Sequence, residues 1–280
     1  MKRFFTLATV VATTGMILGA GFVGAAGAAS ASVAANHVNP GGTIVRAPSN
    51  GGLPTISENW SGYAATAAKK FNFASSSFVQ PAVTCTGAPN RWTSNWVGLD
   101  GFTTGTVEQT GTFSFCGGKS NLTPRYEAWY EMFPAGSVSV FKVKPGDTIN
   151  TAVKFTGGKF HISIADATSG KSFSISKACA TCERASAEWI IERPALCNNS
   201  GTKCILTALA NFGLATMSKD LAQVAGGPVK GIGGFNNNEI FMVQPLKKGG
   251  FISLDDVSGL SGPSFQVEWL RSGSPFPITF

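Results

Sequence analysis

The stretch that decides the fold of this 280-residue chain is Ala187-Glu188-Trp189-Ile190-Ile191-Glu192. It combines β-branched and aromatic residues, contains no Gly or Pro, and is soon followed by Pro194, so it predicts a β-strand. Because side chains alternate across a strand, Glu188, Ile190 and Glu192 share one face. A carboxyl group on so apolar a strand is partly desolvated, which raises its pKa and suits it to acid–base chemistry. The alternative is that Glu188 is a solvated residue on an outer sheet face.

Short strand patterns separated by Gly and Pro turns recur along the chain, without a helical period longer than about two turns. The clearest lie at residues 138–143, 148–155, 161–164, 172–176, 239–243 and 264–269. The turn at residues 166–171 predicts a hairpin, and the Gly-rich run at 226–234 predicts a mobile loop. The pattern is typical of an all-β sandwich or barrel.

The N-terminus resembles a secretory signal peptide. Lys2 and Arg3 precede an apolar run at residues 4–23, and small residues then lead to the cleavage-site pattern Ala29-Ser30-Ala31. A membrane anchor is the alternative, since the run approaches the ~20 residues that span a bilayer. We interpret residues 1–31 as a signal peptide and expect a soluble, secreted protein with no membrane association after cleavage.

The remaining chain divides by composition. Residues 32–57 are rich in Asn, Pro, Gly, Ser and Ala without periodicity, so we expect a flexible linker or a short pro-segment. Residues 58–280 are long enough for one β-sandwich domain.

The charge balance limits the partners. The formal net charge is +7, from 22 Lys and Arg against 15 Asp and Glu. The basic residues are scattered, whereas a nucleic-acid binder shows a basic patch, so we expect no nucleic-acid partner and a monomer. The chain has few carboxylates whose protonation would destabilise the native state in acid. The composition therefore permits activity at low pH.

Six cysteines in an exported chain predict disulfides, with 15 possible pairings. For Cys179 and Cys182 a local loop staple is favoured over a redox motif or half a zinc site. Cys197 and Cys204 bracket a turn and are expected to pair, which leaves Cys85 and Cys116 by elimination.

Histidine is scarce, since the chain contains only His37 and His161. The histidines that Ser-His-Asp, Cys-His and many metal-dependent hydrolases require are therefore scarce. We expect neither a metal nor a cofactor. Carboxylates and amides remain as candidates.

Three further strands place a polar group beside an aromatic or apolar residue on one face. These groupings are Trp96 with Asp100, Val107 with Gln109, and Trp129 with Glu131. Each is compatible with an ordinary sandwich strand, but together they indicate a polar groove lined by aromatic residues.

The same segments resemble the glutamic peptidases, or eqolisins, a family of secreted acid endopeptidases. The matching segments, in the family's order, are SNWVGLDG at 94–101, VEQTG at 107–111, YEAWYEMFP at 126–134 and AEWIIE at 187–192. The resemblance covers the chain from about Asn59 onward and is weakest after about residue 220.

The resemblance implies a β-sandwich of two large antiparallel sheets with the architecture of concanavalin A-like lectins. It implies polypeptide substrates and a catalytic pair that falls on Gln109 and Glu188. Cleft residues of the family fall on Trp96, Asp100, Trp129 and Glu131. Two departures concern the pH profile and substrate preference: an acidic residue that can follow the QTG motif is absent at Thr112-Phe113-Ser114, and this chain is basic.

Two other functions share these features. A glycoside hydrolase on the same architecture would use two carboxylates such as Glu131 and Glu188, without needing Gln109. A non-catalytic carbohydrate- or peptide-binding module would use Trp96 and Trp129 as a stacking platform.

Overall fold

The computed structural model describes residues 37–39, 55–198 and 203–278. They belong to one compact unit, Ser32–Phe280. The expected signal peptide lies outside the described residues. Among those described, no helix is both long and apolar enough to cross a membrane.

The larger sheet has ten strands and carries the segments singled out in the sequence. Its strands, in spatial order, are β19 (Phe251–Ser253), β18 (Asn236–Pro245), β3 (Trp60–Thr66), β12 (Ser186–Glu192), β5 (Arg91–Leu99), β6 (Val107–Gly117), β7 (Thr123–Phe133) and β8 (Val138–Lys142), with β2 (Thr55–Ser57) beside β18 and β15 (Ala208–Leu209) beside β5. Only the pairs β2–β18 and β15–β5 are parallel among the described pairings of this sheet.

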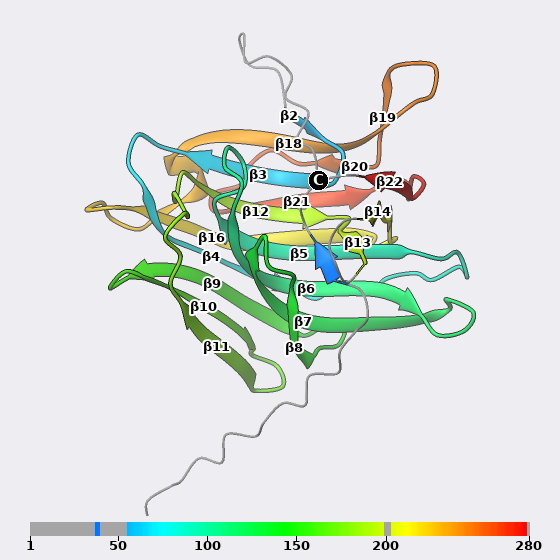
Figure 1. Ribbon diagram of the computed structural model, residues 1–280, viewed down its shortest axis with the longest axis horizontal. Helices are drawn as coiled ribbons and strands as arrows, with labels where there is room; N and C mark the ends of the chain where they lie inside the picture. Colours follow the sequence, from blue (N-terminus) through cyan, green and yellow to red (C-terminus); the bar gives the residue numbers. More distant parts are fainter. Residues whose placement is uncertain (1–36, 40–54, 199–202, 279–280) are drawn as a thin grey trace, which may run out of the picture. The chain divides into compact units, whose positions relative to one another are not determined.

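A second sheet of eight strands and a small sheet of four complete the unit (Figure 1). The eight strands are β11 (Lys171–Lys177), β10 (Lys159–Asp166), β9 (Thr148–Thr156), β4 (Phe71–Val79), β16 (Leu214–Val224), β21 (Ser264–Trp269) and β20 (Asp255–Val257), with β17 (Lys230–Gly231) beside β16. The four are β1 (His37–Asn39), β13 (Ala195–Cys197), β14 (Cys204–Leu206) and β22 (Phe276–Ile278). The prediction of an antiparallel β-sandwich with two large sheets is confirmed.

The main core lies between the two large sheets and follows the period of two in the sequence. Trp189 and Ile191 of β12 point inward and pack with residues such as Ile162 and Phe78 of the other sheet. The Trp189 indole Nε1 also donates to the Ser75 backbone oxygen at 2.8 Å, which ties β12 to β4. The alternate residues of β12 therefore face the opposite side of the larger sheet.

That opposite face carries a second apolar cluster, which includes Trp60, Trp96, Phe113, Trp129 and Ile190. Because Ile190 separates Glu188 from Glu192 on this face, both carboxyl groups lie among apolar side chains.

All three expected disulfides are present: Cys85–Cys116, Cys179–Cys182 and Cys197–Cys204. Three disulfides are consistent with an oxidising compartment outside the cytosol.

Two segments are more ordered than their composition indicates. Strands β1 and β2 lie within residues 32–57, the expected linker or pro-segment, and they pair with β13 and β18. In the Gly-rich run, β17 is followed by the 3-10 helix η1 (Ile232–Gly234). Ile232 is fully buried in the main core. Its apolar side chain therefore anchors a turn whose glycines alone would leave it unrestrained.

Carboxyl groups are mostly inside the fold, where nine of the fifteen Asp and Glu residues are buried. Burial raises the pKa of Asp220 to about 8, against a smaller lowering by the Ser76 hydroxyl that donates to it at 2.7 Å. Burial likewise raises the pKa of Asp255 to about 7. The pKa of Asp166 is lowered instead: burial raises it, but hydrogen bonds that include those from Ser169 outweigh this effect.

We predict that the protein is more stable in acid than at neutral pH. A group whose pKa is raised by folding stabilises the fold fully below its unfolded pKa, about 4 for Asp, and loses that contribution as pH rises through the folded pKa. The free energy of unfolding in urea should therefore fall by several kcal/mol from pH 4 to pH 8. The variant Asp220→Asn should show a shallower fall, and a stability that rises over this range would contradict the prediction.

Candidate active site

Four residues on four neighbouring strands lie in one row across the larger sheet. Glu188 of β12 pairs with Gly98 of β5, Gly98 pairs with Gln109 of β6, and Gln109 pairs with Glu131 of β7. Directly paired residues of an antiparallel sheet project to the same face. Since adjacent strands lie about 4.8 Å apart, the Cα atoms of Glu188 and Gln109 are about 10 Å apart.

Gly98 keeps the space between the two polar side chains open. A Cβ atom there would lie 3.0 Å from Trp96 Cζ3 and 3.2 Å from Gln109 Cβ, distances tighter than ordinary packing. A larger side chain would project between Glu188 and Gln109.

Glu131 fixes the orientation of the Gln109 amide. The Gln109 Nε2 atom donates to Glu131 Oε2 at 2.7 Å, and both side chains are fully buried. An amide nitrogen carries two hydrogens, so one N–H of Gln109 remains for another acceptor. Burial raises the pKa of Glu131 well above its usual range, with a further contribution from Glu192.

Glu188 is fully buried, so the sequence-based alternative of a solvated outer-face residue is wrong. Within the described part of the chain, neither of its carboxyl oxygens makes a hydrogen bond of normal geometry, and the same holds for Gln109 Oε1. Burial raises the pKa of Glu188 well above its usual range, and Asp100 and Glu108 add to the rise. Polar contacts with the Ser186 side chain and the Phe102 backbone lower the pKa of Glu188 but do not offset the effect of burial. Buried polar atoms that lack a hydrogen bond of normal geometry thus lie on both sides of Gly98, and a water molecule or a polar substrate group could satisfy them.

Asp100 lies outside the row and anchors the segment that leads into β12. Its two carboxyl oxygens accept the backbone N–H groups of Arg184 and Ala185 at 2.6 and 2.7 Å. The residue has φ of +68° at the end of β5, a conformation that Asp tolerates better than most residues. Asp100 therefore positions the strand that carries Glu188.

The two tryptophans lie in the adjacent row, fully buried. Trp96 pairs with Gly111, which pairs with Trp129. The indole Nε1 of Trp96 donates to Glu192 Oε2 at 2.7 Å, and the Trp129 ring stacks on Phe113 with centroids 4.7 Å apart. Both rings therefore pack within the apolar cluster and do not form an open stacking platform.

Glu192 is the site residue that sequence reasoning missed. Besides Trp96, it accepts the Asn59 side-chain Nδ2 at 3.1 Å, so each of its oxygens has a partner. The signal was present, since Glu192 lies on the Glu188 face four residues along, but nothing in the sequence shows which indole it meets.

Metal-ligating groups do not gather at the row. Among the described residues, the group with suitable spacing is Glu108 with Cys179 and Cys182, whose candidate ligand atoms lie within 4.8 Å of one another. The two cysteines form a disulfide and therefore offer no thiolate.

The row is closed in this structure. Gln109, Glu188, Trp96, Asp100, Trp129 and Glu131 are all 0% exposed. A groove lies on the eight-stranded sheet.

A model of the Peptidase A4 family matches residues 58–259, which include the whole row. The chain belongs to the Peptidase A4 family. This assignment confirms the resemblance noted in the sequence and makes the chain a glutamic peptidase by family.

Individual members of the Peptidase A4 family agree with this assignment. Scytalidopepsin B of Scytalidium lignicola is 32% identical over 183 residues, which are 62% of this chain and 66% of that protein, just under two thirds of its length. Scytalido-glutamic peptidase, solved with a transition state analog inhibitor, matches the fold with a TM-score of 0.65 and 23% identity over 76% of this chain and 98% of that one. Aspergilloglutamic peptidase of Aspergillus niger matches with a TM-score of 0.50 and 25% identity over 64% and 99%.

Proposed function

We propose that this chain is a secreted endopeptidase that hydrolyses peptide bonds at acidic pH, with Glu188 as general base and Gln109 as oxyanion donor. The observation that carries the proposal is the row itself, in which a fully buried carboxyl and an oriented amide flank a glycine. Family membership supports the reaction class. One relative was solved with a peptide-based transition state analog, which supports polypeptide substrates.

The chemistry divides between the two side chains. Ionised Glu188 takes a proton from a water molecule as the water attacks the scissile carbonyl, then delivers that proton to the leaving amine nitrogen. The free N–H of Gln109 donates to the oxyanion as it forms; one such donor is worth ~3–4 kcal/mol in comparable sites. Gln neither gains nor loses a proton, so the roles do not exchange.

The pKa of Glu188 is raised while the row is closed to solvent. Burial disfavours the carboxylate, so Glu188 is neutral in acid while no solvent reaches it. Entry of water rehydrates the carboxyl, lowers its pKa and produces the ionised base before the peptide binds. Glu131 retains its place beside Gln109 and keeps the N–H aimed toward the gap.

Stability supports an acidic working pH. The buried carboxyls of Asp220 and Asp255 stabilise the fold in their neutral forms, which exist only below their raised pKa values. An enzyme built on this fold is therefore most stable in acid.

The glycoside hydrolase alternative fits the row poorly. Glu131 and Glu188 are three strands apart, with Gln109 between them in the row. The Gln109 amide is hydrogen-bonded to Glu131 Oε2, whereas the two carboxyls of a glycosidase flank the scissile bond directly. A carbohydrate-binding platform also requires open aromatic rings, whereas Trp96 and Trp129 are buried.

Substrate class can be tested with the purified protein incubated with denatured casein and, separately, with a soluble β-glucan, from pH 2 to pH 7. We expect peptide fragments from casein, most rapidly in the acid half of the range, and intact glucan. Glucan cleavage without casein cleavage would replace this proposal with the glycosidase alternative. Retention of casein without fragments would favour a binding module.

We predict that Gly98→Val lowers kcat/KM on casein at least about tenfold. The added methyl groups project into the space where the water and the scissile carbonyl must meet, and a small misplacement of reacting groups has effects of this size. The matched control is Gly105→Ala, because a Cβ at Gly105 meets nothing within 4 Å. Initial rates of the two folded variants at one acidic pH would show the difference, and equal rates would remove Gly98 from the account.

A further inference from the structure

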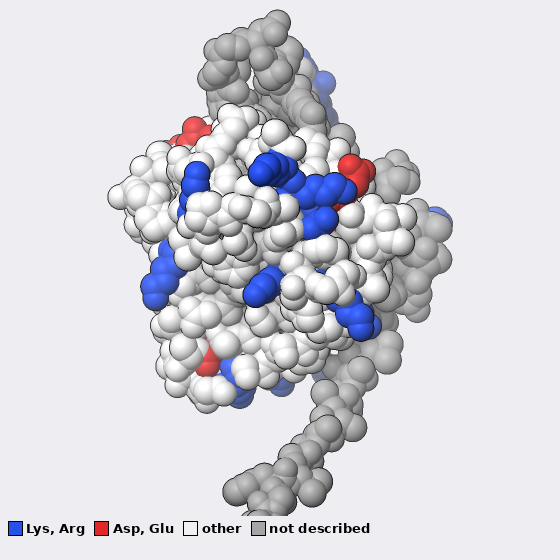
Figure 2. Space-filling model, turned by 90° about the vertical axis from the view of Figure 1, so that its left-hand side faces the viewer, with Lys and Arg blue, Asp and Glu red and all other residues white. Residues whose placement is uncertain are grey.

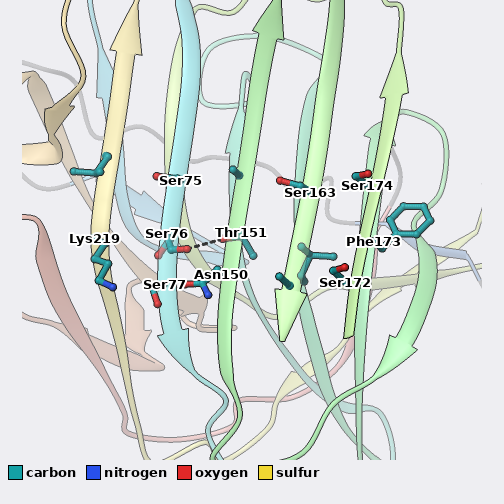
Figure 3. A pocket seen from close by; sticks show the side chains of 14 residues that line it. Ser75, Ser76, Ser77, Asn150, Thr151, Ser163, Ser172, Phe173, Ser174 and Lys219 are labelled. Carbon is teal, nitrogen blue, oxygen red and sulfur yellow. Dashed lines mark hydrogen bonds between the residues drawn. The ribbon is translucent and has the colours of Figure 1, made fainter. Parts of the chain in front are cut away.

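A groove of about 520 Å³ lies on the outer face of the eight-stranded sheet. It runs across β16, β4, β9, β10 and β11, so it spans about 19 Å at the usual strand spacing (Figure 3). In register, Ser77 aligns with Asn150, Ala165 and Ser172, and the neighbouring row consists of Ser75, Ala152, Ser163 and Ser174. Alternate residues of these strands face the main core, so the groove and the candidate active site lie on opposite faces of the sandwich.

The groove carries hydroxyl and amide groups among apolar side chains such as Phe173 and Leu221. Ser163, Ser172 and Ser174 are exposed along β10 and β11, and Asn150 adds an amide. Ser77 is 7% exposed and lines the groove at its floor. Hydroxyl and amide groups that line a groove are suited to a polar ligand.

One cation is aimed at this floor by an irregularity of the sheet. The pairing of β16 with β4 shifts register between Ser218 and Leu221, which marks a β-bulge. Within the bulge Lys219 has φ of +52°, a conformation rare for Lys. Bulges re-aim side chains, and here the exposed Lys219 lines the groove beside Ser77 (Figure 3).

The surroundings are cationic. None of the described residues lining the groove is Asp or Glu. The next row on the same face pairs Lys154 with His161, both exposed. Most acidic residues of the protein are buried. On another side of the molecule, the left-hand side of Figure 1, Lys and Arg also outnumber Asp and Glu (Figure 2). The field near the groove therefore attracts anions.

We propose that this groove binds an acidic polysaccharide, whose hydroxyls meet the serines and Asn150 while a carboxylate meets Lys219. Hydroxyls both donate and accept hydrogen bonds, which suits a polyol ligand, and Lys219 supplies a point charge for the acidic group. A chain laid across the strands has five strands to contact. Such a site would hold the protein on an acidic polymer while the opposite face remains free.

The test uses the intact purified protein and polygalacturonate as the probe, with dextran as a neutral polyol and polyglutamate as an anion without hydroxyls. We expect binding to polygalacturonate, weakened by added salt, and markedly weaker binding to both other polymers. Equal binding to polyglutamate would mean that net charge alone is recognised and would overturn the proposal, as would failure to bind polygalacturonate.

The decisive variant is Lys219→Asn, because Asn tolerates positive φ while the change removes the ammonium group and most of the alkyl stem. We expect it to weaken polygalacturonate binding about fivefold, as for loss of one partly exposed ion pair. Ser163→Tyr, which fills the groove, should also weaken binding. The matched control is Lys247→Asn, an exposed lysine in the turn between β18 and β19. Equal effects of the two lysine variants, with equal thermal unfolding, would contradict a groove site.

Discussion

Glu188→Gln should leave the fold intact and reduce peptide hydrolysis at least about 10³-fold. Gln has the shape of the neutral carboxyl that burial favours in the closed row, so the free energy of unfolding in acid should change little. The rate should collapse because an amide cannot take a proton from water, and general acid–base catalysis contributes 10²–10⁴-fold. Initial rates on denatured casein, measured with a urea unfolding curve at the same pH, separate the two effects.

A matched control is Glu127→Gln on β7. Glu127 pairs with Phe113 two rows away from Gln109, and its carboxyl accepts the Ser139 hydroxyl at 2.8 Å. That variant should hydrolyse casein at the parent rate. If Glu188→Gln behaves in the same way, Glu188 has no part in the mechanism.

Gln109→Ala should lower kcat about 10²–10³-fold and change KM little. The Gln109 N–H is proposed to reach full strength only when the carbonyl oxygen becomes an oxyanion, so its removal affects the transition state more than the bound substrate. The same change leaves Glu131 without its hydrogen bond, and the carboxyl becomes still easier to protonate. Steady-state kinetics on a defined peptide cut from casein by the parent enzyme would give kcat and KM separately.

The control for Gln109 is Gln80→Ala. Gln80 is also a buried amide and donates to the Ser114 hydroxyl at 2.8 Å, but it lies outside the row. Its loss should affect stability more than kcat. A Gln109→Ala enzyme with near-normal kcat, or one damaged only in KM, would rule out the oxyanion role.

Local alternation predicted more of this fold than composition did. In β12 the period of two correctly separated Trp189 and Ile191 from Glu188, and the structure places the two apolar residues in the main core. The Cys197–Cys204 disulfide followed from turn spacing, because the two residues lie directly opposite each other in an antiparallel pair, and Cys85–Cys116 followed by elimination. These features depend on residues that are close together in the sequence, so a local sequence pattern can predict them.

Register was the property that the sequence did not contain. Cross-strand partners are fixed by pairing over long separations, so nothing in the motif at 94–101 shows that Gly98 falls between Glu188 and Gln109. For the same reason Glu192 was not expected to bind Trp96, and the bulge at Lys219 was not expected at all. The apolar strand around Glu188 predicted partial desolvation of its carboxyl, but the full burial of every candidate side chain depends on what packs above the sheet.

The most direct test of the central claim compares kcat/KM for the parent, Glu188→Gln, Gln109→Ala and the double variant on one peptide at one acidic pH. If the base and the oxyanion donor act on the same water-attack step, each single change should be severe and the double variant should be little slower than the worse single variant. A single variant near the parent rate, or losses that simply multiply, would show that the two side chains do not work as one catalytic pair.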